Sequence, residues 1–152
     1  MTGRFIRKIS FFIILGLNCI TAAPLYAEQS VFVNEINAGL VGEKEFIDGY
    51  VLIPAVPVYW ESDVPFRITV SSLEPELGVS DGSSYAKSLH DLQWKITDEE
   101  TWIPVSQDKE EVAFGAEGGS GVIYIDVLIY LDWLKDFPGK YAVALIFSIE
   151  PI

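Results

Sequence analysis

The strongest constraint on the fold is a strict alternation of large apolar residues near the end of the chain. Between residues 141 and 149, every second position is large and apolar: Tyr141, Val143, Leu145, Phe147 and Ile149. A period of two is that of a β-strand with one face turned to a core. The alternation recurs in residues 64–72 and 91–97, with these inward positions: Phe66, Ile68, Val70, Leu92, Trp94 and Ile96. No stretch has a long period near 3.6, so the sequence predicts an all-β protein.

Further apolar segments, bounded by turn-forming residues, complete this pattern. They cover residues 30–38, 50–62, 101–106, 111–114 and 122–133. One of them contains Pro54 and Pro57, which cannot donate to a strand ladder, so we expect it at a sheet edge or with a bulge. Another is apolar on both faces apart from Asp126 and Asp132, which predicts a central strand covered on both sides.

The number and spacing of these segments predict the architecture. About 7–9 short strands in one domain, residues 28–152, are typical of an immunoglobulin-like antiparallel β-sandwich. The two longest segments, 122–133 and 141–151, are separated by a short connection that contains Pro138 and Gly139. We therefore expect these two strands to pair as an antiparallel hairpin.

The N-terminal segment has the three-part layout of a secretory signal peptide. Three cationic side chains precede an apolar run, residues 9–17, and small residues then lead to Ala27. We predict cleavage after Ala27, so that residues 1–27 are a signal peptide. The apolar run is shorter than the roughly 20 residues that span a bilayer, so no stable membrane span is expected after cleavage. The predicted location is secreted, periplasmic or at the cell surface; an uncleaved anchor and lipidation at Cys19 are the alternatives.

Charge and cysteine content narrow the class of partner. Cleavage would remove three cations and no acid, which moves the formal net charge from -12 to -15. This charge disfavours nucleic acid and anionic membrane surfaces and favours solubility, with a basic partner or a cation as the alternative. Cleavage would also remove the single cysteine. The mature domain would then have no disulfide, and its stability would depend on its core.

No motif predicts catalysis or a cofactor. His90 is the only histidine, and Ser88 and Asp91 adjoin it in sequence, whereas catalytic triads bring together distant segments. We therefore predict that the protein is not an enzyme. One histidine and no mature cysteine do not suit zinc or copper. Calcium accepts oxygen ligands and stays an alternative, with three acidic stretches as candidates: residues 80–84, 98–100 and 108–111.

Aromatic residues are the best candidates for ligand contacts. Trp94 alternates with core positions, so four others are candidates for a ligand platform: Tyr59, Trp60, Trp102 and Trp133. Tyr124 and Tyr130 share one face of their strand with Asp126 and Asp132, and this face is a further candidate contact surface. Because aromatic platforms flanked by acids bind sugars by stacking and hydrogen bonding, a carbohydrate-binding module is the alternative function.

The order of segments resembles the β-sandwich modules of bacterial secreted and cell-surface proteins and, more loosely, the WxL group of cell-wall-associated domains. The segments are VYWESDVPFRITVSS, LQWKI, TWIPVS, a glycine turn, a strand ending in LDW, and FPGKYAVALIFSIEP. The two Trp-x-Leu signatures of that group correspond to residues 66–68 and 147–149, where Phe66 and Phe147 replace the tryptophans. The resemblance implies the fold and a surface location, and attachment to peptidoglycan is not carried over.

These features predict a non-catalytic exported protein that is a structural or adhesive component of the cell envelope or of an extracellular assembly. The expected partners are another protein, further copies joined through edge strands, or a cell-surface polysaccharide. In a pilin-like variant, residues 30–38 would leave their own sheet and pair with a neighbour's edge.

Overall fold

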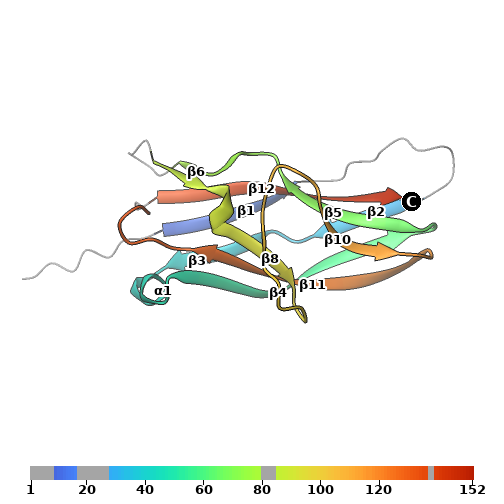
Figure 1. Cartoon of the computed structure of the whole chain (residues 1–152), viewed down its shortest axis with the longest axis horizontal. Helices are drawn as coiled ribbons and strands as arrows, with labels where there is room; N and C mark the ends of the chain where they lie inside the picture. Colours follow the sequence, from blue (N-terminus) through green and yellow to red (C-terminus); the bar gives the residue numbers. More distant parts are fainter. Residues whose placement is uncertain (1–8, 17–27, 80–84, 137–138) are drawn as a thin grey trace, which may run out of the picture.

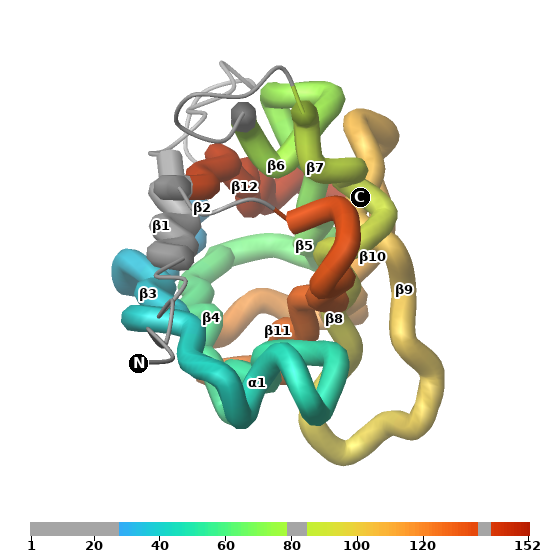
Figure 2. The backbone as a smooth tube through the Cα atoms, turned by 90° about the vertical axis from the view of Figure 1, so that its left-hand side faces the viewer, coloured from blue at the N-terminus to red at the C-terminus, as the bar shows by residue number. Residues whose placement is uncertain are grey.

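The computed structural model describes residues 9–16, 28–79, 85–136 and 139–152, which form a sandwich of two five-stranded sheets and a separate two-stranded sheet (Figure 1). The prediction of an all-β sandwich is confirmed. In Figure 2, which looks along the strands, the two layers lie one above the other and the helix of residues 43–48 crosses one end.

The elements are assigned to the sheets as follows. The first sheet has the order β10 (Glu110–Gly115), β5 (Phe66–Ser72), β12 (Gly139–Pro151), β1 (Ile9–Gly16) and β3 (Ile36–Val41). The second has the order β2 (Gln29–Val33), β4 (Tyr50–Ser62), β11 (Gly119–Tyr130), β8 (Leu92–Ile96) and β9 (Ile103–Pro104). The small sheet joins β6 (Glu76–Val79) and β7 (Ala86–Ser88), and the helices are α1 (Glu43–Asp48) and the 3-10 turn η1 (Leu89–Asp91).

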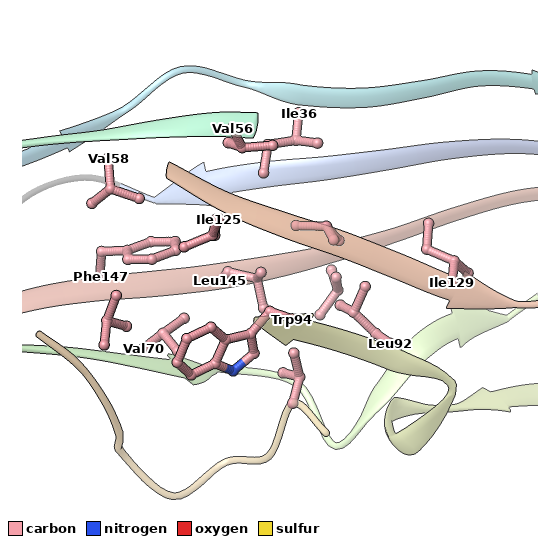
Figure 3. Packing of buried hydrophobic residues seen from close by; sticks show 14 of the residues in the cluster. Ile36, Val56, Val58, Val70, Leu92, Trp94, Ile125, Ile129, Leu145 and Phe147 are labelled. Carbon is pink, nitrogen blue, oxygen red and sulfur yellow. The ribbon is translucent and has the colours of Figure 1, made fainter. Parts of the chain in front are cut away.

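The inner faces of the two large sheets form the core. Figure 3 shows side chains from both sheets meeting there, among them Leu145 and Phe147 of β12, Val58 of β4, Ile125 of β11 and Trp94 of β8. The residues that alternate in β5 and β12 are buried, as predicted, and Leu92 and Trp94 are buried in β8. The alternation therefore identified the inner face of three strands because neighbouring residues of a strand point to opposite sides.

The two longest strands do not form the predicted hairpin. β11 pairs with β4 and β8 in the second sheet, whereas β12 pairs with β5 and β1 in the first. The connection makes a short turn in which the amide of Asp136 donates to the carbonyl of Asp132 at 2.8 Å, and the chain then passes to the other layer. The prediction was wrong because two long apolar strands bury their inner faces equally well as opposite layers of a sandwich.

Strand β4 avoids the proline problem with a bulge rather than an edge position. It lies between β2 and β11, and its pairing with β11 shifts register between the pairs Ile125–Val56 and Val127–Ile53. Ala55 lies in this bulge with a φ of 53°, in the left-handed region that non-glycine residues rarely adopt. The predicted bulge is confirmed, and the edge alternative does not apply.

Residues of the predicted signal peptide contribute a strand. β1 runs parallel to β12 and antiparallel to β3, and it lies between them in the first sheet (Figure 1). The predicted cleavage site after Ala27 lies outside the described residues. Without β1, the large sheets contain nine strands. None of the helices in the described ranges is long and apolar enough to cross a membrane.

Candidate functional site

The outer face of the second sheet carries a set of exposed, large apolar side chains, which we call the aromatic face. Each of its residues is between 38% and 59% exposed: Phe32, Tyr50, Leu52, Tyr59, Val122, Tyr124 and Tyr130. They come from the three adjacent strands β2, β4 and β11. These strands therefore carry apolar side chains on both faces, and those of the inner face form part of the core.

Strand register brings these side chains into rows. Tyr59 is paired with Phe32 on one side and with Val122 on the other, and the rings of Phe32 and Tyr59 have centroids 6.5 Å apart. At the other end of the same ladder, Tyr130 is paired with Tyr50. Since residues paired directly across a ladder point to the same side, the rows form one surface. The eight residue steps from Val122 to Tyr130 correspond to roughly 27 Å.

A polar cluster lies between the two ends of the aromatic face. The Asp126 carboxylate accepts hydrogen bonds from the backbone amide of Ala55 and from the Thr97 hydroxyl, both at 2.9 Å, and forms an ion pair with Lys95 at 3.1 Å. Burial alone would raise the pKa of Asp126, but these three donors outweigh it and lower the pKa. At neutral pH, the negative charge of Asp126 is therefore balanced by the positive charge of Lys95.

The cluster also holds the bulge of β4 in place. The left-handed backbone conformation of Ala55 costs about 1 kcal/mol of stability. The amide of Ala55 has no partner in the strand ladder, and it donates to Asp126 instead. The polar centre of the aromatic face is thus tied to the backbones of β4 and β11 together.

The structure separates the residues predicted as a ligand platform. Tyr59 lies on the aromatic face, whereas Trp60 turns inward and packs against Phe66 with ring centroids 4.4 Å apart and the rings tilted by 36°. Trp102 precedes β9, and the Lys95 ammonium lies 5.5 Å from its ring centroid. Tyr59 and Trp60 point to opposite sides because they are neighbours in one strand.

Trp133 lies at the far end of the molecule from Tyr59. It follows β11 and stacks on Phe46 of α1 with a centroid distance of 4.5 Å. The pair Tyr130–Tyr50 lies at one end of the β4–β11 ladder, and Tyr59 lies near the other end. Trp133 follows Tyr130 along the chain, so it lies beyond the end that is remote from Tyr59. Of the four predicted residues, only Tyr59 belongs to the aromatic face.

A buried lysine is the feature that sequence reasoning missed. Lys87 of β7 is fully buried, and its ammonium binds both carboxylate oxygens of Asp136 at 2.7 and 2.9 Å and Asp91 at 3.1 Å. Asp136 also accepts the backbone amide of Asp132 at 2.8 Å. Lys87 and Asp136 are 49 residues apart, so no local pattern could have predicted their contact.

A hollow of about 450 Å³ lies beside this ion pair. Its lining comes from β7, η1 and the residues that follow β11: Tyr85, Ala86, Lys87, Ser88, Asp91, Tyr130, Leu131, Asp132 and Lys135. Burial and the negative charges of Asp136 and Asp91 raise the pKa of Tyr85 to about 12. The ion pair and the turn around it connect the small sheet to the end of β11.

The adjacent Ser88, His90 and Asp91 have structural contacts. The Ser88 hydroxyl accepts the backbone amide of His90 at 3.3 Å at the start of η1, and the Asp91 carboxylate is bound by Lys87. His90 itself is solvent-exposed. These contacts describe a capped turn.

The acidic stretches do not converge in the described part of the chain. There, no three of the residues His, Cys, Asp and Glu lie together as metal ligands, and residues 80–84 are outside it. In the stretch 98–100, the carbonyl of Glu99 accepts the Lys95 ammonium at 2.8 Å. In the stretch 108–111, Lys109 forms an ion pair with Glu150.

No known protein-family model matches the chain, and no curated protein matches it in sequence.

Proposed function

We propose that this is a non-catalytic exported protein, a structural component of the cell envelope or of an extracellular assembly, whose copies associate through the aromatic face. The observation that carries the proposal is the row structure of that face, with Phe32, Tyr59 and Val122 side by side and exposed. The layout of the N-terminal segment supports export, and the resemblance to cell-surface modules supports the same location.

Physical chemistry favours a contact role for this surface. Monomeric soluble proteins rarely expose contiguous apolar patches larger than a few hundred Å². After cleavage the protein would carry a formal charge of -15, which would repel a second copy, yet the charge at the centre of the face, Asp126, is neutralised by Lys95. Two copies that meet here therefore encounter no unpaired charge at Asp126.

The test is a double substitution, Tyr59→Ser with Tyr124→Ser, in the exported protein. We expect the parent to associate as its concentration rises and the double variant to stay monomeric, measured by light scattering. Phe114→Ser is the matched control because Phe114 is 61% exposed but lies on β10 of the other sheet. A monomeric parent at every concentration, or equal association of all three proteins, would contradict the proposal.

A carbohydrate-binding role is the second candidate, and the neighbouring rings of Phe32 and Tyr59 favour it. Sugar rings stack on such aromatic side chains, while Glu61 at the same end of β4 supplies a carboxylate. We expect polysaccharide-containing gels to retard the parent and the Phe114→Ser control but not the Tyr59→Ser, Tyr124→Ser variant. Equal migration of all three across a broad set of polysaccharides would exclude this candidate.

A further inference from the structure

In the first sheet, the connection between β12 and β3 depends on β1. This strand pairs with β12 over eight residues, from Ile9–Gly139 to Gly16–Ile146, and with β3 between the pairs Ile9–Val41 and Ile13–Ile36. β12 and β3 are not neighbours in the sheet order, so β1 alone joins them. Figure 1 shows β1, in blue, lying alongside β12.

Cleavage after Ala27 would remove this strand. The two flanking strands would then lie two ladder spacings apart, roughly 10 Å, and each would present unpaired amide and carbonyl groups to the gap. This position we call the β1 slot: the space between Gly139–Ile146 of β12 and Ile36–Val41 of β3. An open slot of this kind binds extended segments because backbone groups need hydrogen-bond partners.

The core beneath the slot also needs a cover. The residues of β12 and β3 in register with odd-numbered positions of β1 include Ile36, Val41, Tyr141, Val143 and Leu145. All five are at most 4% exposed with β1 in place. Register pairs them with Ile13, Ile9, Phe11, Ile13 and Leu15, which are all large and apolar. An occupant of the slot therefore requires large apolar residues at alternate positions.

We propose that the processed protein binds, in the β1 slot, an extended segment of a different polypeptide that carries large apolar residues at every second position and runs parallel to β12. This inference rests on the export and cleavage in the proposed function, and it concerns a surface separate from the aromatic face. A different polypeptide is assigned because the strands described from residue 28 onward pair with strands other than β1, apart from β3, which itself borders the slot. Gln29–Val33, for example, pairs with β4.

The first experiment measures the mass of the exported protein. It then measures the binding of a peptide with the sequence of residues 8–17, detected by fluorescence polarisation and by the melting temperature of the protein. We expect a mature chain that starts at Glu28, saturable binding and a raised melting temperature. Ile13→Asp in the peptide should weaken binding at least tenfold, and Ile14→Asp, on the opposite side of the strand, should weaken it much less. Equal binding of the three peptides, no binding, or an intact N-terminus would overturn the inference.

The second experiment tests direction by disulfide trapping, because cleavage leaves the mature chain without cysteine. A Ser10→Cys peptide should crosslink to a Lys140→Cys protein, its partner in the parallel register, and not to an Ile146→Cys protein, which lies opposite Gly16. The reverse preference would overturn the proposed direction.

Two outcomes identify other ways of filling the slot. Slow hydrogen exchange, without peptide, of the β12 and β3 amides that face the slot would mean that these strands have closed on each other. Oligomers of the Tyr59→Ser, Tyr124→Ser variant that the peptide dissociates would mean that a second copy is the occupant. Either result overturns the assignment of a different polypeptide. Neither affects the aromatic face, whose failure would be seen as unchanged association of that variant.

Discussion

The two faces of the second sheet carry similar apolar side chains, yet the inner face is buried whereas most of the large side chains of the outer face are exposed. On β11, Ile125, Val127 and Ile129 point inward and are at most 1% exposed, whereas Tyr124 and Tyr130 point outward and are 48% and 43% exposed. The inner side chains are covered by the first sheet. The difference teaches that an apolar face on a strand indicates a contact, and that the opposite layer decides whether that contact is the core.

The largest predicted effect of burial on stability comes from comparing a buried ion pair with an exposed one. Lys87→Met should lower the free energy of unfolding by about 3–5 kcal/mol, because it leaves the carboxylate of Asp136 buried without a counter-charge. Chemical denaturation measures this loss. Lys135→Met is the control, since the pair of Lys135 with Asp132 is solvent-exposed and such pairs contribute little. Equal losses in the two variants would show that burial does not set the strength of these pairs.

Neighbouring residues of β11 provide the next largest effect. Ile129→Ala should lower the free energy of unfolding by about 2–4 kcal/mol, because Ile129 is 1% exposed and the substitution leaves a cavity. Tyr130→Ala, one residue further along on the outer face, should cost less than about 1 kcal/mol. Thermal or chemical denaturation of both variants tests the assignment of inner and outer faces. A larger loss for Tyr130→Ala would break the comparison.

The polar cluster of the outer face predicts a smaller, pH-dependent effect. The pKa of Asp126 is lowered in the folded protein, so its contribution to stability is full above its unfolded pKa of about 3.9 and is lost as the pH falls through the lower, folded pKa. Asp126→Asn should therefore cost about 1 kcal/mol at neutral pH and flatten the loss of stability below about pH 4. Denaturation curves at several pH values measure this.

A graded control is available within the same cluster. Thr97→Val removes one of the hydrogen bonds to Asp126 and keeps Lys95, so its pH dependence should lie between those of the parent and Asp126→Asn. A pH dependence in Asp126→Asn that is identical to the parent's would mean that this carboxylate makes no contribution to the acid sensitivity.

Sequence patterns identified much of the fold and part of the candidate site: Tyr124 and Tyr130, predicted to share a face with Asp126, lie on the aromatic face. The alternation in β5 and β12 identified their buried faces, and Pro54 with Pro57 predicted either an edge position or the bulge that is present, because both inferences depend on residues within one strand. Of the predicted platform, only Tyr59 lies on the aromatic face. The others could not be placed because a tryptophan is equally apolar when it stacks on Phe66 in the interior, as Trp60 does.

By itself, the sequence determined the all-β class, the inner side of its clearest strands and the acidic charge of the chain. These properties are local or additive, so they can be obtained without knowing which segments meet. Only the tertiary structure decided that β11 and β12 belong to opposite sheets, that Lys87 meets Asp136, and that β1 lies between β12 and β3. Each of these is a pairing of distant segments, and its free energy depends on the partner's geometry, which no single stretch of sequence contains.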